Sequence, residues 1–405
     1  MKNQTTQLVW AMPRTKGHMT MTERAVAHQR GLGLIELLVA MTISLFMVIA
    51  LITVFSSVKS GFAYTNNAVR VSEDASYTLD MIGRDIRMTA FAGCTGSNFT
   101  VDAASVTTYT PKFDLISGQT ISTANLKPNP FAGVITGNLS DVFTSKNAIW
   151  GFAANNSAAI GVLGGGSASY TVSATTPMLY MAGGSAQAIQ VRSAVAAVTA
   201  DIAIPSDTYS WANNVNPTYM IISDCKGSEI FKATAFTSGG GTIKNIAHGG
   251  GANENNSASL VNTYSSDALV MPLTSSVYFL ATRVGRVVPS LYRRYFNGSI
   301  ATVEELVENV EAIVFHYGVN TTNTGGGEPT YITDIYQTDP TAVTDWSRVV
   351  SVRMGLVMVS EESGQTAASG QSVPWLGGTL TPGAADRRVR RAYSTTVSIR
   401  NRMGL

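Results

Sequence analysis

A run of 22 uncharged residues, positions 37–58, constrains this chain more than any other feature. Glu36 precedes the run, Lys59 follows it, and Leu, Val, Ile, Met and Phe dominate between them. As an α-helix with a rise of about 1.5 Å per residue, the run is about 33 Å long, enough to cross the hydrocarbon core of a bilayer. No Ala-x-Ala cleavage site follows it, so the run differs from a secretory signal peptide.

Basic residues gather before this run. Counted up to residue 31, the charged positions are Lys2, Arg14, Lys16, Glu23, Arg24 and Arg30, a local balance of +4. This excess predicts that the N-terminus stays cytoplasmic and that everything after Lys59 lies outside the inner membrane. The whole chain carries +2, so the remainder is about −2 and offers no electrostatic case for general nucleic-acid binding.

Glu36 calls for an explanation of its own. A carboxylate at the start of an apolar run is disfavoured by a few kcal/mol unless it is neutralised, reaches the membrane surface or finds a partner. On a generic membrane protein, an acid that reaches the membrane surface from a helix end would be the simpler interpretation. The residues that precede Glu36 favour a different one.

The motif GLGLIE, residues 31–36, closely resembles the cleavage site of type IV prepilins and type II secretion pseudopilins. The resemblance implies that a prepilin peptidase cuts after Gly31 and that Leu32 becomes a methylated N-terminus. It also implies that Glu36 pairs with the free amine of a neighbouring subunit in a filament, so that two groups costly in an apolar core neutralise each other. Leu32 and Gly33 stand where the commonest pattern has Phe and Thr, and both keep the site apolar or small.

The same resemblance sets the domain boundaries. It implies a leader peptide at 1–31, a transmembrane or filament-core helix at 32–58, an amphipathic second half of that helix at 59–93, and a β-rich periplasmic or extracellular head at 94–405. The leader is long for the family's commonest type, and Met19 and Met21 are alternative starts to Met1.

After Lys59 the apolar pattern becomes periodic. Small and apolar residues recur at spacings of three and four, at Ala68, Val71, Ala75, Leu79, Ile82, Ile86 and Ala90. No proline occurs between Gly31 and Cys94, so one continuous helix of roughly 55 to 60 residues is expected. The predicted fold is α+β, a long N-terminal helix packed on a β-rich head.

The head is predicted to consist of strands and loops. The strand candidates are 188–193, 219–223, 230–236, 269–273, 277–283, 291–296, 312–319, 349–359 and 392–399. Residues 303–310 are typical of a short helical turn. The segment from 95 to about 200 is poor in charge and rich in Ser, Thr, Asn and Gly, which predicts a surface-facing insertion.

Three C-terminal segments narrow the resemblance. Residues 307–319, 345–362 and 386–402 resemble the PilW minor pilins and, more remotely, the J-type pseudopilins. The expected function is therefore a minor pilin that primes type IV pilus assembly at or near the tip. Its expected partners are the prepilin peptidase, other minor pilins, the major pilin and a large tip adhesin. It would lie in the inner membrane before assembly and on the pilus surface afterwards.

Two alternatives use the same N-terminal motif. One is a pseudopilin of type II secretion, and the other is a tip-located module that binds a surface or DNA. The basic residues Arg387, Arg388, Arg390 and Arg391 could suggest DNA contact. Strand alternation splits them between two faces, which favours a solvated or salt-bridged strand with Glu308 and Glu311 as partners.

The chain has two cysteines, Cys94 and Cys225, both after the apolar run. In an exported segment a disulfide is the expected state, with two buried free thiols as the alternative. No CxxC motif, zinc spacing, EF-hand loop, G-x-S-x-G elbow or H-E-x-x-H motif occurs, so we expect no enzymatic activity and neither cofactor nor metal.

Overall fold

The computed structural model describes residues 33–93, 114–115, 148–156, 159–160, 163, 168–206, 211, 219–224, 228–249, 260, 263–298, 301–322, 332–361, 370 and 372–402. The chain forms two compact units, residues 1–59 and residues 60–405. The second unit contains the later part of the N-terminal helix together with the head.

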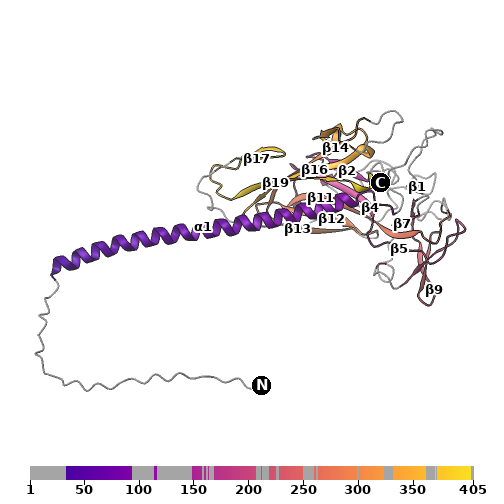
Figure 1. Ribbon diagram of the computed structural model, residues 1–405, viewed down its shortest axis with the longest axis horizontal. Coiled ribbons are helices and arrows are strands. Elements are labelled where there is room, and N and C mark those ends of the chain that lie inside the picture. The colour runs from indigo at the N-terminus through magenta and orange to yellow at the C-terminus, as the bar shows by residue number, and fades with distance from the viewer. Residues whose placement is uncertain are drawn as a thin grey trace, which may run out of the picture. The chain divides into compact units, whose positions relative to one another are not determined.

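Helix α1 runs without interruption from Leu34 to Met88, a length of 55 residues (Figure 1). Gly33 caps its start, since the backbone carbonyl of Gly33 accepts hydrogen bonds from the N–H groups of Glu36 and Leu37. The helix ends just before Ala90, whose φ of 62° is left-handed and cannot continue an α-helix. The prediction of one continuous helix is confirmed.

The predicted apolar stripe of α1 is the part that the second unit buries. The buried residues of α1 are spaced by three or four except for one adjacent pair, and they are Ala68, Val71, Ala75, Thr78, Ile82, Gly83 and Ile86. Leu79 of the predicted stripe is half-buried. Before residue 60, the described side chains of the helix are all exposed. The two halves of α1 therefore differ in what they contact, as the change from uniform to periodic hydrophobicity predicts.

The largest sheet of the head has ten strands around β11 (Leu269–Arg283). Its main order is β1-β8-β7-β11-β12-β13, with β2, β3, β4 and β5 joined alongside. All described pairings are antiparallel except that of β1 with β8. The bounds are β1 Asp114–Leu115, β2 Ile149–Phe152, β3 Tyr170–Val172, β4 Met178–Gly184, β5 Ile189–Gln190, β7 Tyr219–Ser223, β8 Ser228–Lys232, β12 Ser290–Phe296 and β13 Ala301–Val307.

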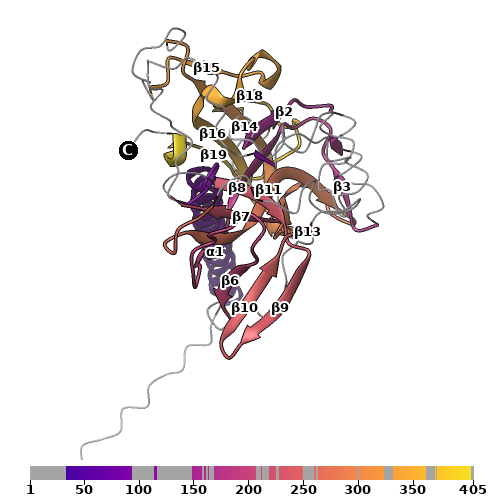
Figure 2. The ribbon, with the colours of Figure 1, turned by 90° about the vertical axis from the view of Figure 1, so that its right-hand side faces the viewer.

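Three smaller sheets complete the described part of the head (Figure 2). A four-stranded sheet has the order β15-β14-β16-β19, a three-stranded sheet the order β6-β10-β9, and β17 pairs with β18 as a hairpin. The bounds are β6 Ile202–Pro205, β9 Ala235–Gly240, β10 Ile243–Ala247, β14 Val310–Val319, β15 Ile335–Gln337, β16 Val349–Val359, β17 Val373–Trp375, β18 Gly378–Leu380 and β19 Arg390–Ser398.

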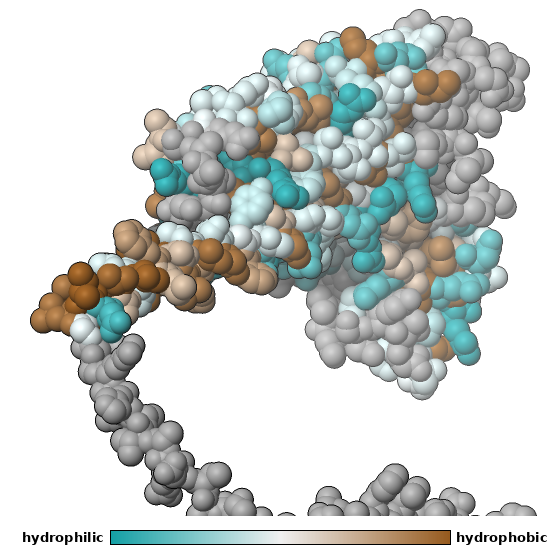
Figure 3. Space-filling view, turned by 60° about the vertical axis from the view of Figure 1, so that its left-hand side comes forward, coloured by the Kyte–Doolittle hydropathy of each residue, from teal (hydrophilic) through white to brown (hydrophobic). Residues whose placement is uncertain are grey.

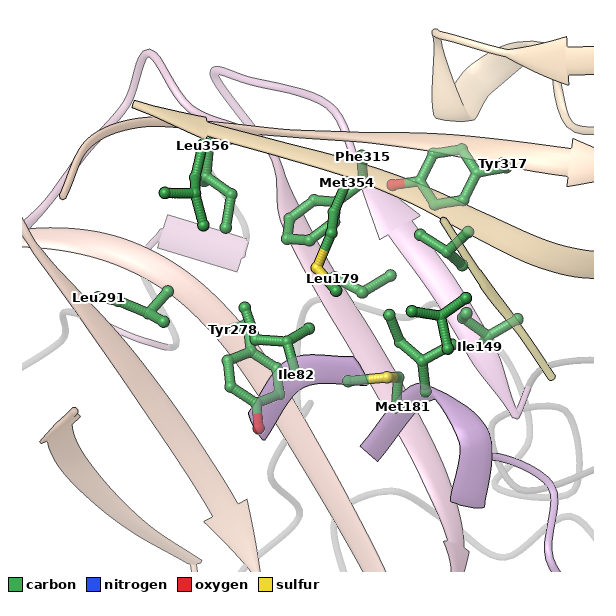
Figure 4. Packing of buried hydrophobic residues seen from close by; sticks show 14 of the residues in the cluster. Ile82, Ile149, Leu179, Met181, Tyr278, Leu291, Phe315, Tyr317, Met354 and Leu356 are labelled. Atoms are coloured by element: carbon green, nitrogen blue, oxygen red, sulfur yellow. The ribbon is translucent and has the colours of Figure 1, made fainter. Parts of the chain in front are cut away.

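The main core lies where α1, the ten-stranded sheet and the four-stranded sheet meet (Figure 4). Ile82 of α1 packs in one cluster with Tyr278 of β11 and Phe315 of β14. Val277 and Phe279, which precede and follow Tyr278 on β11, belong to a second apolar cluster. Because β11 alternates between two clusters, both of its faces are buried, and its sequence shows a nearly continuous apolar run.

The structure corrects three predictions about the head. Residues 303–310 do not form a helical turn, because strand β13 occupies 301–307 and pairs with β12. The segment 95–200 is not only a surface insertion, since β4 supplies fully buried residues such as Leu179 and Tyr180 to the core. The predicted strands 269–273 and 277–283 are one continuous strand, β11.

Candidate functional site

Glu36 lies in the first turn of α1 and is exposed. Its Oε2 atom accepts a hydrogen bond of 3.1 Å from the backbone N–H of Gly33, the capping residue. A helix start leaves four N–H groups without helical partners and carries partial positive charge, so a carboxylate three residues in is stabilised there. In a single chain, Glu36 therefore caps its own helix.

Gly31 and Leu32, the predicted cleavage and methylation positions, lie outside the described residues. Their roles stay predictions. Gly33, the residue that follows Leu32, has its carbonyl oxygen in the first helical hydrogen bonds. A cut after Gly31 would thus leave a new amine one residue before the helix cap.

The apolar part of α1 is long enough to cross a membrane and is uncovered in this single chain. Leu34 is 80% exposed, and Phe46 and Phe55 are more than 70% exposed. Figure 3 shows this surface as a nearly continuous hydrophobic stretch of the helix. So large an exposed apolar surface fits membrane anchoring or packing against other apolar helices.

The C-terminal end of α1 is joined to the head by backbone hydrogen bonds. The N–H of Ala90 donates to the carbonyl of Ala182 at 2.9 Å, and the N–H of Gly184 donates to the carbonyl of Phe91 at 2.6 Å. Gly183 permits this approach, since a Cβ there would lie 2.9 Å from the carbonyl oxygen of Met88. The helix end thus lies directly against β4.

Asp85 makes a second connection between α1 and the sheet. Its Oδ2 accepts a hydrogen bond of 2.7 Å from the Tyr278 hydroxyl and a longer one from Ser276. Arg293 of β12 lies 3.5 Å from the same oxygen. Burial raises the pKa of Tyr278 well above its ordinary value, so the hydroxyl stays a donor at neutral pH. No sequence pattern indicated this cluster, because it depends on strand register and on the rotation of α1.

The basic residues near the C-terminus form structural ion pairs. Arg390, with only 3% of its side chain exposed, donates from Nε to Glu311 at 2.6 Å and also contacts Asp386. Arg388 donates to the same Asp386 carboxylate at 2.6 Å. The predicted ion pairing is confirmed for Arg388, Arg390 and Glu311, although Arg388 precedes strand β19 and only Arg390 lies in it. Glu308 has different partners, since Arg286 and Arg283 pair with it.

Neither Cys94 nor Cys225 is among the described residues, and the disulfide stays a prediction. The residues beside them lie close together. The Ser228 hydroxyl donates to the carbonyl of Ala92 at 3.2 Å, and a Cβ on Gly93 would lie 2.7 Å from the hydroxyl oxygen of Ser223. Ser223 and Ser228 are paired across β7 and β8. Gly93, which precedes Cys94, therefore lies against the strand pair that flanks Cys225 in sequence.

Comparison with known proteins adds a match to a family model over part of the chain. Residues 277–401, 125 of the 405, match the family model described as Type IV Pilus-assembly protein W, PilW. The resemblance to the PilW family is confirmed over this segment. The PilW segment contains β12, β13, β14, β16 and β19, and with them the Arg390 ion pairs. Over this segment the chain is similar to type IV pilus-assembly proteins, and its long apolar helix fits a pilin-like protein.

Two further comparisons contribute little. The chain is similar to a solved type IV-like pilin from Thermus thermophilus with 15% identity and a TM-score of 0.18, covering 46% of this chain and 86% of that one. This structural similarity is too low to support a statement about fold or function. No curated protein matches the chain.

Within the described ranges, no group of three or more His, Cys, Asp or Glu side chains is placed to hold a metal ion.

Proposed function

We propose that the protein is a structural subunit of a type IV pilus, a minor pilin without catalytic role that primes assembly and is built in at or near the tip. A prepilin peptidase removes residues 1–31, and Leu32 becomes the methylated N-terminus. The protein then joins other minor pilins and the major pilin, with a tip adhesin as a further partner. Before assembly it is anchored in the inner membrane with its head in the periplasm.

One observation carries this proposal. The apolar half of α1 is uncovered, and its one carboxylate, Glu36, is placed at the start of the helix, beside the predicted cleavage position. A simple membrane anchor needs no acid there. A filament subunit does, because its freed amine would otherwise be unpaired in an apolar bundle.

The geometry at Glu36 supports a specific form of this pairing. In the single chain, the carboxylate accepts from the Gly33 N–H and has its other oxygen available. A carboxylate can accept several hydrogen bonds, so Glu36 can meet an amine of a neighbouring subunit while it still caps its own helix. We infer that pairing between subunits adds to the cap and need not replace it.

The test compares three forms of the full-length protein in the cells that make it: wild type, Glu36→Ala and Glu73→Ala. Glu73 is an exposed acid on the same helix and serves as the matched control. Removing one partner of an ion pair in apolar surroundings costs about 3–5 kcal/mol. We therefore expect Glu36→Ala to lower the amount of this protein in sheared pili more than about tenfold. Glu73→Ala should leave that amount unchanged, and all three should be equally abundant in the membrane.

N-terminal sequencing and intact mass of the membrane form complete the test. We expect a chain that begins at methylated Leu32. A protein that keeps its basic leader, or a Glu36→Ala variant that enters pili normally, would contradict the proposal. Loss of protein secretion with normal piliation in a gene deletion would instead assign the chain to the type II secretion pseudopilins.

A further inference from the structure

A cleft of about 700 Å³ lies in the second unit, between α1 and the ten-stranded sheet. The later turns of α1, from Tyr77 to Thr89, form one wall, and the segment Ser185 to Gln187 after β4 forms another. The floor consists of residues from β4, β11 and β12. Neither the family match nor the predicted pilus role assigns anything to this cleft.

The strand register explains the chemistry of the floor. Ser276 of β11 lies opposite Met181 of β4 on one side and opposite Tyr295 of β12 on the other. Thr274, two residues away on β11 and therefore on the same face, lies opposite Gly183. The floor thus combines two hydroxyl groups, which donate to the Gly183 carbonyl and to Asp85, with the Tyr295 ring, over which the Arg293 guanidinium lies. The sheet's other face is apolar core.

The walls of the cleft are held in place before any ligand arrives. At one end, the backbone bonds from Ala90 to Ala182 and from Gly184 to Phe91 join α1 to β4. Within the cleft, Asp85 joins α1 to the floor through Tyr278 and Ser276. A site whose walls are fixed in this way loses little conformational freedom on binding.

The charges that line the cleft balance. The lining contains two carboxylates, Asp80 and Asp85, and two guanidinium groups, Arg84 and Arg293. Asp85 and Arg293 lie 3.5 Å apart at the floor, whereas Asp80 is at the rim with its side chain 84% exposed. A balanced lining favours a neutral polar ligand over a phosphate or a nucleic acid, which would need an excess of positive charge.

Exposed groups at the rim indicate which neutral ligand fits. Tyr77 is 60% exposed, and Gln187 is exposed on the opposite wall. Aromatic rings present a flat apolar face, while amide, carboxylate and guanidinium groups form planar sets of donors and acceptors. This combination matches a sugar ring, which has apolar C–H faces and a rim of hydroxyl groups. We propose that the cleft binds a neutral oligosaccharide.

The test uses the full-length protein in a detergent without a sugar headgroup. Maltopentaose, cellopentaose and chitotetraose are titrated separately up to about 10 mM, a range that covers weak sites, and binding is followed by saturation-transfer NMR. We expect saturable binding of at least one of them. Tyr77→Ala should weaken it about tenfold, while Tyr77→Phe, which keeps the ring, should stay within about twofold of wild type.

Tyr64→Ala is the matched control, because Tyr64 is a partly exposed tyrosine of the same helix outside the cleft. It should bind as wild type does. The proposal fails if none of the three oligosaccharides gives saturable binding, or if Tyr77→Ala binds as tightly as Tyr64→Ala. A Gly-Ser tetrapeptide is titrated alongside, and its binding in place of the sugars would overturn the proposal in favour of a protein segment.

Discussion

Arg390 shows how a charged side chain can become part of a core. Only 3% of its side chain is exposed, and two carboxylates, Glu311 and Asp386, surround it. Such a group raises stability little compared with an apolar replacement, but removing Arg390 takes the ion-pair partner from the partly buried Glu311 and leaves Asp386 with Arg388 alone. The arginine therefore matters for folding of the PilW segment and has no free charge for a ligand.

Replacing Arg390 should destabilise the head strongly. We expect Arg390→Ala to lower the free energy of unfolding by about 3–5 kcal/mol, because Glu311 and Asp386 lose their common partner. Arg391→Ala, at the neighbouring exposed position, should change it by less than about 0.5 kcal/mol. Denaturant unfolding of the detergent-solubilised protein, followed by near-UV circular dichroism, measures both. Equal effects of the two substitutions would contradict a buried ion cluster.

The same cluster predicts a dependence on pH. Hydrogen bonds from Arg388, and next from Arg390, hold the pKa of Asp386 well below its usual range. A depressed carboxyl pKa contributes stability that is fully present above the unfolded value of about 3.9 and is lost as pH falls through the folded value. We expect the melting temperature of the wild type to decrease once the pH drops below about 4, and we expect a smaller decrease for Asp386→Asn. Parallel melting curves from pH 6 to pH 3 would contradict this assignment.

Single residues were predictable from the sequence where one pattern sufficed. Glu36 stood out because a lone carboxylate in an apolar run is costly. Five of the seven buried positions of α1 followed from their spacing, and Thr78 and Gly83 are the exceptions. Asp85 could not be predicted. Its partners Tyr278 and Arg293 lie opposite each other on β11 and β12, and only the register of that pair brings them under the helix.

At the scale of elements, the end of α1 and strand β4 are in direct backbone contact. Gly183 lies within contact of the helix end, where a Cβ would meet backbone atoms of Met88 and Phe91 at 2.9 and 3.1 Å. Backbone cannot move aside as a flexible side chain can. This junction is therefore sensitive to one added methyl group.

We expect Gly183→Ala to destabilise the protein by about 1–3 kcal/mol, the usual cost of overpacking. Gly383→Ala is the control, since a Cβ at Gly383 would meet nothing within 4 Å. Thermal unfolding of both variants under identical detergent conditions measures the difference. A Gly183→Ala protein as stable as the control would show that the end of α1 can separate from β4 without loss.

The elements differed in how well the sequence predicted them. Helix α1 followed from periodicity and from the lack of proline over its whole length. Strand β13 was misread, because two glutamates and two valines at residues 303–307 also fit a helical turn, and pairing with β12 decides the conformation. Strand β4 was missed because its apolar run lacks alternation, which is typical of a strand buried on both faces.

At the scale of the whole molecule, the residues that follow α1 contact the strand pair β7–β8, which lies far away in sequence. Ala92 and Gly93 contact Ser228 and Ser223, although more than 120 residues separate them. The two cysteines directly follow Gly93 and Asp224 in sequence. A cross-link between Cys94 and Cys225 would close a loop of about 131 residues.

We predict a Cys94–Cys225 disulfide in the exported protein. The unreduced, denatured protein should not react with iodoacetamide and should be lighter by two hydrogens than the reduced form. The double variant Cys94→Ser, Cys225→Ser should lose about 2–5 kcal/mol of stability, and the reduced wild type should behave in the same way. Alkylation of both thiols without prior reduction would contradict the prediction.

The backbone bonds between Ala90 and Ala182 and between Gly184 and Phe91 also have a mechanical meaning. A pull along α1 is transmitted through them into β4, and from β4 through a ladder of pairs into β11. The attachment of the helix and the centre of the ten-stranded sheet therefore depend on the same short stretch of backbone, residues 182–184 of β4.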